Sequence, residues 1–356
     1  MQSPVTNEDA IVAVAAVEGT VRVNISLALE SKADVTVSKD GSGKFTTVKE
    51  AVASAPENSK TRYTILVKRG TYLENVIIGK NKTNLTILGE GSNLTTITGS
   101  WNHVDGKGTY DSATLGILIL VYTISAVDGE GFMAQDICIE NTAGPTKEQA
   151  VALRVSADKA VIYRCRIDAY QDTLYAHIER QFYRECYITG MVVFICGEAT
   201  AVFQHCRIEA RKPLKEQSNM ITAQQRYSKS KISWFSIQKC EIKATPDLDQ
   251  VKGTVQTFLG RPWGVYSTVV VMQSLIDDVI DPAGWAPWDN DKGRLSTLFY
   301  GEYQNSGPGA GTVKRITWKG FKVITNPEEA EQFTVEKLLQ GQSWIRSTGV
   351  PYDEGF

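Results

Sequence analysis

Long hydrophobic runs, paired metal-binding cysteines and an excess of one charge are all missing from this sequence of 356 residues. No apolar run reaches the 18 or more residues that a membrane span needs, and the longest candidate, Leu115 to Ile124, has about half that length. The 38 basic and 40 acidic side chains nearly cancel, which argues against a general nucleic-acid binder. We therefore expect neither a membrane protein nor a nucleic-acid partner.

Metal ligands are also scarce. None of the six cysteines forms a CxxC pair, and the chain has only three histidines, so the sequence predicts no zinc site. The apolar stretch 11–17 follows Glu8 and Asp9, whereas a secretory signal begins with a positive region, so no clear signal peptide is predicted. Four N-x-S/T sequons nevertheless favour a secreted glycoprotein: Asn24, Asn81, Asn84 and Asn93.

A short pattern recurs four times in the middle of the chain. It reads apolar-x-x-Cys-x-Ile, counting tyrosine as apolar, and its cysteines are separated by 21, 20 and 34 residues: Cys165, Cys186, Cys206 and Cys240. A unit of about 20 residues with one short strand is typical of one coil of a β-solenoid. The longer third step predicts a coil that carries a long loop, from Arg211 to Ser230.

Other short apolar runs extend the series of strands, and helical periodicity is rare. The best helix candidate, residues 45–55, would cover the open end of a solenoid, and residues 335–339 form a second, shorter one. No linker divides the chain. The sequence predicts an all-β, single-domain solenoid with short capping helices over residues 34–356, preceded by an unassigned extension, residues 1–33.

The stacked cysteines allow two interpretations. Cysteines one coil apart can form a disulfide if their Cα atoms come within about 7 Å of each other. Alternatively, each buried cysteine fills a ladder position as a small apolar side chain. The spacing alone favours neither.

Three segments are unusually polar among these strands: residues 149–154, 168–175 and 259–263. Taken singly, a Gln-Asp pair is common in turns and an arginine near a tryptophan commonly stacks on it. Together with Lys39-Asp40-Gly41-Ser42-Gly43, Asn141-Thr142-Ala143-Gly144, Asp281-Pro282-Ala283-Gly284-Trp285 and Tyr300-Gly301-Glu302-Tyr303, they closely resemble the plant pectin methylesterases, in the same order, from about residue 34 to 356.

This resemblance implies a right-handed parallel β-helix that hydrolyses methyl-esterified galacturonate in pectin without a cofactor. It also implies a monomeric protein secreted to the cell wall, with pectin as partner and a proteinaceous pectinesterase inhibitor as a second candidate partner.

The resemblance also assigns roles to individual residues. Asp172 corresponds to the acid/base aspartate, Gln149 and Gln171 to the glutamines that stabilise the oxyanion, and Arg261 to the arginine that holds the nucleophilic carboxylate. Aromatic side chains suit the apolar faces of sugars, and three are expected to line the substrate cleft: Tyr175, Trp263 and Trp285.

The nucleophile is where the chain departs from the family. The family motif Gly-Thr-Val-Asp-Phe-Ile-Phe-Gly reads Gly190-Met191-Val192-Val193-Phe194-Ile195-Cys196-Gly197 here, so Val193 occupies the aspartate position. An isopropyl group has no lone pair with which to attack a carbonyl. Glu198 is not expected to replace it, because it lies an odd number of residues away and strand side chains alternate between faces.

The resemblance also implies two disulfides, Cys138–Cys165 and Cys206–Cys240, and leaves Cys186 and Cys196 unpaired. Residues 115–125 look like an apolar insertion near the cleft.

Three functional hypotheses remain open at this point. The first is a pectinesterase whose catalysis is impaired, with Asp172 activating water directly. The second is a non-catalytic pectin-binding protein. The third is a scaffold that acts on another small molecule with Asp172 as acid or base.

Overall fold

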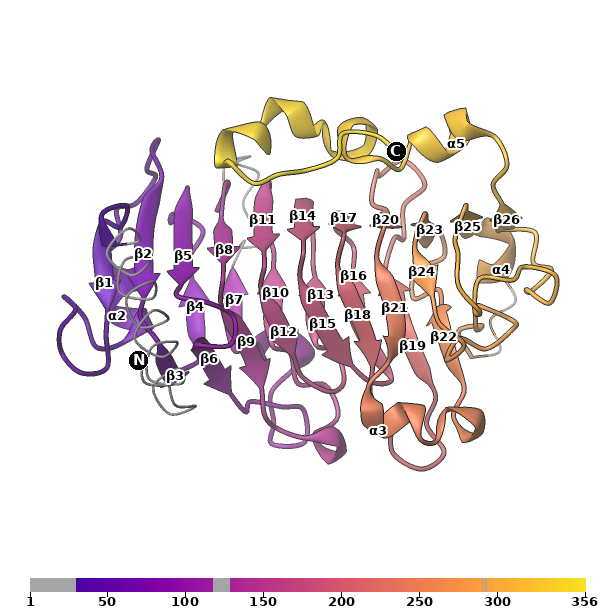
Figure 1. Cartoon of the computed structure of the whole chain (residues 1–356), viewed down its shortest axis with the longest axis horizontal. Coiled ribbons are helices and arrows are strands. Elements are labelled where there is room, and N and C mark those ends of the chain that lie inside the picture. The colour runs from indigo at the N-terminus through magenta and orange to yellow at the C-terminus, as the bar shows by residue number, and fades with distance from the viewer. Residues whose placement is uncertain (1–29, 118–128, 290, 292) are drawn as a thin grey trace, which may run out of the picture.

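Three parallel β-sheets make up the computed structural model, which describes residues 30–117, 129–289, 291 and 293–356. The strands of successive coils stand side by side along the long axis of the molecule (Figure 1). Every strand pair is parallel and in register, so the chain forms the predicted right-handed parallel β-helix.

The first sheet has eleven strands: β1 (Val35–Val37), β2 (Tyr63–Val67), β5 (Leu85–Gly89), β8 (Met133–Gln135), β11 (Ala160–Tyr163), β14 (Arg180–Arg184), β17 (Thr200–Gln204), β20 (Phe235–Gln238), β23 (Thr268–Met272), β25 (Phe299–Tyr303) and β26 (Phe321–Val323). The second has eight: β3 (Gly70–Leu73), β6 (Thr95–Gly99), β9 (Cys138–Asn141), β12 (Arg166–Asp168), β15 (Tyr187–Gly190), β18 (Arg207–Ala210), β21 (Glu241–Ala244) and β24 (Leu275–Ile276).

The third sheet has seven strands and carries the candidate site: β4 (Val76–Ile78), β7 (Leu115–Ile117), β10 (Leu153–Val155), β13 (Leu174–Ala176), β16 (Val193–Gly197), β19 (Asn219–Gln224) and β22 (Thr257–Gly260). Residues 115–117 pair with both β4 and β10, so they form an ordinary rung of the solenoid. The remainder of the proposed insertion, residues 118–125, lies outside the described residues.

The helices are short and lie at the ends and edges of the sheets: α2 (Val48–Ser54), α3 (Pro246–Asp249), α4 (Arg294–Thr297), α5 (Pro327–Glu331), the 3₁₀ turns η1 (Thr109–Asp111), η2 (Pro145–Lys147), η3 (Lys252–Thr254), η5 (Gly341–Ser343) and η6 (Arg346–Thr348), and the π-helical η4 (Val335–Leu339). No helix of the described part of the chain is long and apolar enough to cross a membrane.

The predicted helix at residues 45–55 exists as α2, which starts three residues later than expected. Thr47 caps it, because its hydroxyl oxygen accepts a hydrogen bond from the backbone N–H of Glu50 at 3.2 Å. The helix buries Val48, Ala51 and Val52 in the main core, at the N-terminal end of the solenoid (Figure 1). Its apolar face therefore covers the interior of the first coils, as the sequence predicts.

The predicted helix at 335–339 is η4, which belongs to the C-terminal segment. This segment runs back over the eleven-stranded sheet (Figure 1) and packs Leu338, Leu339 and Trp344 against Val161 and Val202. The C-terminal segment thus covers apolar side chains that the sheet would otherwise expose.

The four repeat cysteines stack as the solenoid interpretation requires. Each directly precedes a strand, and those strands align in register through Arg166, Tyr187, Arg207 and Glu241. All four side chains lie in the main core. The repeated apolar-x-x-Cys-x-Ile pattern therefore reflects one buried cysteine of constant size in each coil.

Both predicted disulfides are wrong for this structure, in which all six cysteines are free and buried. Cys138 pairs in register with Arg166, one residue out of step with Cys165, so the two side chains point to opposite faces. Cys206 and Cys240 are in step and their thiols lie against each other, but both remain free. Each thiol also lies near a backbone carbonyl: Cys206 Sγ is 3.5 Å from the oxygen of Tyr183, and Cys240 Sγ is 3.3 Å from that of Phe203.

Candidate active site

The outer face of the seven-stranded sheet carries a second apolar cluster, separate from the main core. Its buried members are Ala113, Val151, Tyr175, Val193, Cys196, Met220, Ala223, Phe258 and Ala286, with Tyr110, Trp263, Ala283 and Trp288 packed against them. Neighbouring residues of the same strands, such as Leu174 and Phe194, face the interior. The alternation of faces therefore places Tyr175 and Val193 together on this outer surface.

The two predicted oxyanion glutamines are neighbours on adjacent coils. Gln149 and Gln171 form a parallel bridge, and the backbone N–H of Ala150 donates to the carbonyl oxygen of Gln171 at 3.1 Å. Among the described residues, neither glutamine side chain has a hydrogen-bond partner, and Oε1 of Gln149 is buried. Two free amides next to each other are suited to donating hydrogen bonds to one bound oxygen.

Asp172 occupies the turn that leads into β13. Its backbone φ is 59°, a left-handed conformation that aspartate tolerates better than most residues. Its backbone N–H donates to the carbonyl oxygen of Val193 at 2.6 Å, which links the two neighbouring coils. Burial raises the pKa of Asp172 to about 7, and the positive charge of Arg261 opposes that rise. The carboxyl group can therefore exchange a proton near neutral pH.

Arg261 follows β22 and lies over an aromatic ring. Its guanidinium carbon is 4.2 Å from the ring centroid of Trp288, and its Nε is buried without a hydrogen-bond partner in the described part of the chain. Burial lowers the pKa of Arg261, whereas the carboxylates of Asp289 and Asp172 oppose that fall. Because arginine titrates far above neutral pH, the guanidinium keeps its charge.

Two of the three predicted aromatic residues lie on this face. Tyr175 and Trp263 have ring centroids 6.5 Å apart. The prediction for Trp285 is wrong, because this residue lies in the core. It is only 1% exposed, and its Nε1 donates to Glu302 Oε1 at 3.1 Å. Sequence reasoning missed Trp288, which stacks on Trp263 at 6.2 Å with an interplanar angle of 6°.

Val193 begins β16 and lies in register with Met220 on the next coil. Its side chain is 5% exposed and belongs to the same apolar cluster as Tyr175. Its isopropyl side chain has neither a hydrogen-bonding nor an ionisable atom. Cys196 is the thiol of the same apolar cluster and lies in register with Tyr175, but burial raises the pKa of this thiol, so it stays protonated and weakly nucleophilic.

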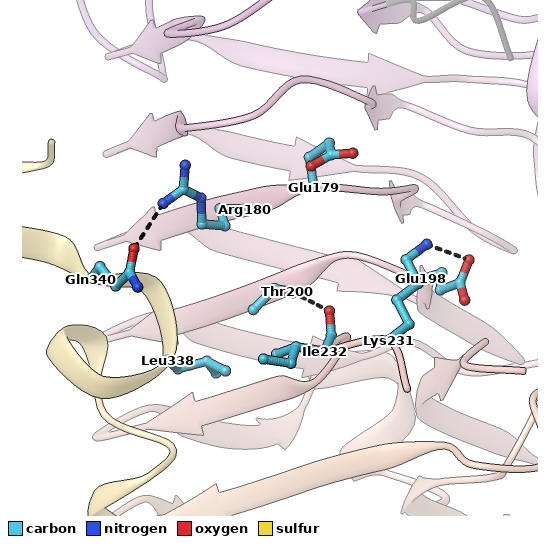
Figure 2. A pocket seen from close by; sticks show the side chains of 8 residues that line it. All are labelled: Glu179, Arg180, Glu198, Thr200, Lys231, Ile232, Leu338 and Gln340. Atoms are coloured by element: carbon cyan, nitrogen blue, oxygen red, sulfur yellow. Dashed lines mark hydrogen bonds and ion pairs between the residues drawn. The ribbon is translucent and has the colours of Figure 1, made fainter. Parts of the chain in front are cut away.

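Glu198 is engaged elsewhere, as expected from the alternation of faces. Its Oε2 forms an ion pair with Lys231 Nζ at 2.9 Å. The pair lines a separate cavity of about 280 Å³ under the C-terminal segment, shown in Figure 2, together with Glu179, Arg180, Thr200, Ile232, Leu338 and Gln340. Glu198 therefore does not supply a carboxylate to the position of Val193.

One further charged group borders the site. Arg154 is 1% exposed, lies in register with Tyr175 and has its guanidinium carbon 3.5 Å from the ring centroid of Tyr110. Its Nε has no hydrogen-bond partner within the described ranges, and burial lowers its pKa. The neighbouring His177 is neutral above pH 4, because burial and the charge of Arg154 lower its pKa to about 4.

Comparison with known proteins gives one consistent match. The family model described as Pectinesterase matches residues 34–342. "Pectinesterase/pectinesterase inhibitor 18" of Arabidopsis thaliana is 60% identical over 326 residues, which cover 92% of this chain and 57% of the relative. "Pectinesterase 2.1" of Solanum lycopersicum is 58% identical over 323 residues, covering 91% of this chain and 57% of the relative. The chain thus spans little more than half the length of these relatives.

Solved structures show the same similarity. A pectin methylesterase from carrot superposes with a TM-score of 0.87 at 51% identity, covering 91% of this chain and 98% of the carrot chain. A pectin methylesterase in complex with a hexasaccharide superposes with a TM-score of 0.66 at 26% identity, covering 86% of this chain and 97% of the other.

Proposed function

Because the chain belongs to the pectinesterase family, we propose that it recognises pectin on the outer face of the seven-stranded sheet and hydrolyses its methyl esters only weakly. The observation that carries this proposal is Val193 beside Asp172, at the position where the family resemblance implies a nucleophilic aspartate. The bridge between Gln149 and Gln171 and the effect of Arg261 on the pKa of Asp172 support the proposal.

Recognition rests on the aromatic and amide side chains. Trp263 and Trp288 form a stacked pair next to Tyr175, and flat aromatic faces suit the apolar faces of a sugar ring. The unpartnered amides of Gln149 and Gln171 would donate hydrogen bonds to the carbonyl oxygen of the ester. These contacts do not involve residue 193. Binding of pectin is therefore expected even though valine stands where the family motif has aspartate.

Residual hydrolysis would proceed without a covalent intermediate. The carboxylate of Asp172 takes a proton from water, and the water oxygen attacks the ester carbonyl while the glutamine amides stabilise the oxyanion. The bond to the methoxy oxygen then breaks, and Asp172 returns its proton to the leaving methanol. Loss of one member of a catalytic unit commonly costs a factor of about 10⁴ to 10⁶ in rate, so turnover is expected to be slow.

The proposed location and partners of this chain come from its family. Curated relatives include a protein named as both a pectinesterase and a pectinesterase inhibitor. We place this chain in the plant cell wall, with pectin as its partner and an inhibitor protein as a second partner.

The proposal is tested by two measurements on the same protein. Binding to methylated pectin, measured by calorimetry, should be retained, whereas methanol release should be slow and should disappear in Asp172→Asn. Failure to bind pectin would contradict the proposed recognition of pectin. Methanol release at the rate of a relative with the complete motif would show that Val193 does not limit catalysis.

A further inference from the structure

The side chains of the candidate site have unused hydrogen-bonding capacity. In the described part of the chain, none of the side chains of Gln149, Gln171, Asp172 and Arg261 forms a hydrogen bond with another protein group. Arg261 also makes no ion pair within 4 Å there, and its Nε is buried. The four residues are half-buried, and two of their atoms, Gln149 Oε1 and Arg261 Nε, are buried without a partner. Buried polar atoms are normally paired, so four unpartnered side chains gathered at one place indicate a site for a ligand.

Val193 changes the kind of ligand that fits. A carboxylate at this position would accept hydrogen bonds from Arg261 and balance its charge. The isopropyl group does neither. The guanidinium lies over Trp288 and has no ion-pair partner within 4 Å among the described residues, so only more distant carboxylates offset its charge. The site consequently offers donors and a positive charge, and it lacks an anionic acceptor close to Arg261.

We propose that this site binds the free carboxylate of a de-esterified uronate unit in preference to the methyl ester. The inference rests on the proposed recognition of pectin and names the chemical form that is bound. A carboxylate presents two strong acceptor oxygens, one for the amides of Gln149 and Gln171 and the other for Arg261. A methyl ester has one good acceptor and would place its methyl group against the charged guanidinium, which costs the guanidinium its hydration without a compensating hydrogen bond.

The charges around Asp172 support this preference at mildly acidic pH. Burial raises the pKa of Asp172 to about 7, so below that pH its carboxyl is mostly protonated and can donate to the ligand. Burial also raises the pKa values of the Cys196 thiol and the Tyr175 hydroxyl, so both stay neutral. The ring of His177, whose pKa is lowered to about 4, is neutral as well.

The remaining charges near the site are those of the buried Arg154, the half-buried Arg261 and two exposed aspartates, Asp111 and Asp289. Arg154 and Arg261 are positive, and Asp289 partly offsets Arg261 from the exposed loop. A uronate, with an ordinary carboxyl pKa of about 3.5, is ionised throughout the range between pH 5 and 8. The attraction is therefore strongest between the pKa of the ligand and that of Asp172, and it weakens as Asp172 ionises.

The test uses two probes of equal length, a fully de-esterified galacturonate hexamer and the same hexamer fully methyl-esterified. Calorimetric titration of the full chain at pH 5.5 should give at least about tenfold tighter binding of the free acid, which corresponds to about 1.4 kcal/mol. Between pH 5.5 and 8.5 the affinity for the free acid should fall about tenfold, because ionised Asp172 repels it.

Two variants separate charge from shape at position 193. Val193→Asp places an anion beside Arg261 and should abolish or invert the preference for the free acid. Val193→Asn introduces a side chain of nearly the same shape as aspartate but without its charge. This variant should keep the preference for the free acid. Circular dichroism and thermal unfolding check that both variants are folded.

The outcomes distinguish the inference from the proposed function. Equal or tighter binding of the methyl ester by the unchanged chain would overturn the inference while leaving pectin recognition intact. A preference that survives Val193→Asp would also overturn it, because the charge at 193 would then be irrelevant. If neither hexamer binds, the proposed recognition fails and the inference fails with it.

Discussion

The backbone N–H of Asp172 donates a hydrogen bond of 2.6 Å to the carbonyl oxygen of Val193, across two neighbouring coils of the β-helix. The acid/base candidate therefore lies directly beside the position at which the family motif has its nucleophile. In place of a second carboxylate, Asp172 faces an apolar cluster, and burial raises its pKa to about 7. This one relationship determines both the weak catalysis and the ligand preference that we propose.

Asp172 should make the stability of the protein depend on pH. Its folded-state pKa, about 7, lies above the usual value of 3.8, so the folded state holds the proton more tightly than the unfolded state. Stability is expected to fall as pH rises from about 4 to about 7. Asp172→Asn cannot titrate, so it should be more stable than the unchanged chain by about 2–4 kcal/mol at pH 8 and nearly equal to it at pH 4.

Urea unfolding at both pH values measures this difference directly. An Asp172→Asn variant with the same relative stability at pH 4 and pH 8 would show that the carboxyl titrates normally in the folded protein.

Replacing Trp285 and Trp288 by alanine should have different effects on ligand binding and on stability. Trp288→Ala removes the ring that contacts both Trp263 and Arg261, and it should weaken binding of a galacturonate oligosaccharide about tenfold with little change in stability. Trp285→Ala serves as the matched comparison, because its ring stacks on Tyr300 at 4.2 Å in the core. It should cost about 3–5 kcal/mol of stability.

Calorimetry and thermal unfolding of both variants separate the two effects. A loss of stability for Trp288→Ala as large as that for Trp285→Ala would contradict the assignment of Trp288 to the site.

A buried ion pair should stabilise the C-terminal coils. Arg315 Nε donates to Glu302 Oε1 at 2.8 Å, and the two side chains are 1% and 2% exposed. Arg315→Ala leaves the Glu302 carboxylate buried without its cation, which should cost about 3–5 kcal/mol. The exposed pair of Lys215 and Glu216, 4.0 Å apart, is the control, and Lys215→Ala should change stability by less than about 0.5 kcal/mol.

Denaturant unfolding of the two variants provides the comparison. Similar effects of Arg315→Ala and Lys215→Ala would mean that burial of the Glu302–Arg315 pair has no energetic consequence.

Much of the fold could be predicted from the sequence because a solenoid repeats its environment. One cysteine per coil occupies the same buried ladder position four times, so its spacing records the length of a coil. The site residues could be placed together for a related reason. Gln149, Gln171 and Asp172 precede consecutive strands of one sheet, and register stacks them.

Side-chain direction outside the strands could not be predicted in the same way. Trp285 and Trp288 both lie in the loop after β24, which has no fixed periodicity. Only the structure shows that Trp285 points inward, where it stacks on Tyr300 and donates to Glu302. The prediction of a Cys138–Cys165 disulfide failed on the same point. A separation of 27 residues brings Cys138 and Cys165 to neighbouring coils but does not show that they face opposite sides of their strands.

The central claim is that a hydrocarbon side chain at position 193 limits hydrolysis. The measurement that tests it most directly is the rate of methanol release from methylated pectin by the unchanged chain, Val193→Asp and Val193→Asn, side by side. The account predicts that Val193→Asp gains about 10⁴-fold in kcat while Val193→Asn gains nothing, because only the aspartate supplies a nucleophilic oxygen beside Asp172 and Arg261. Equal rates for all three proteins would contradict it.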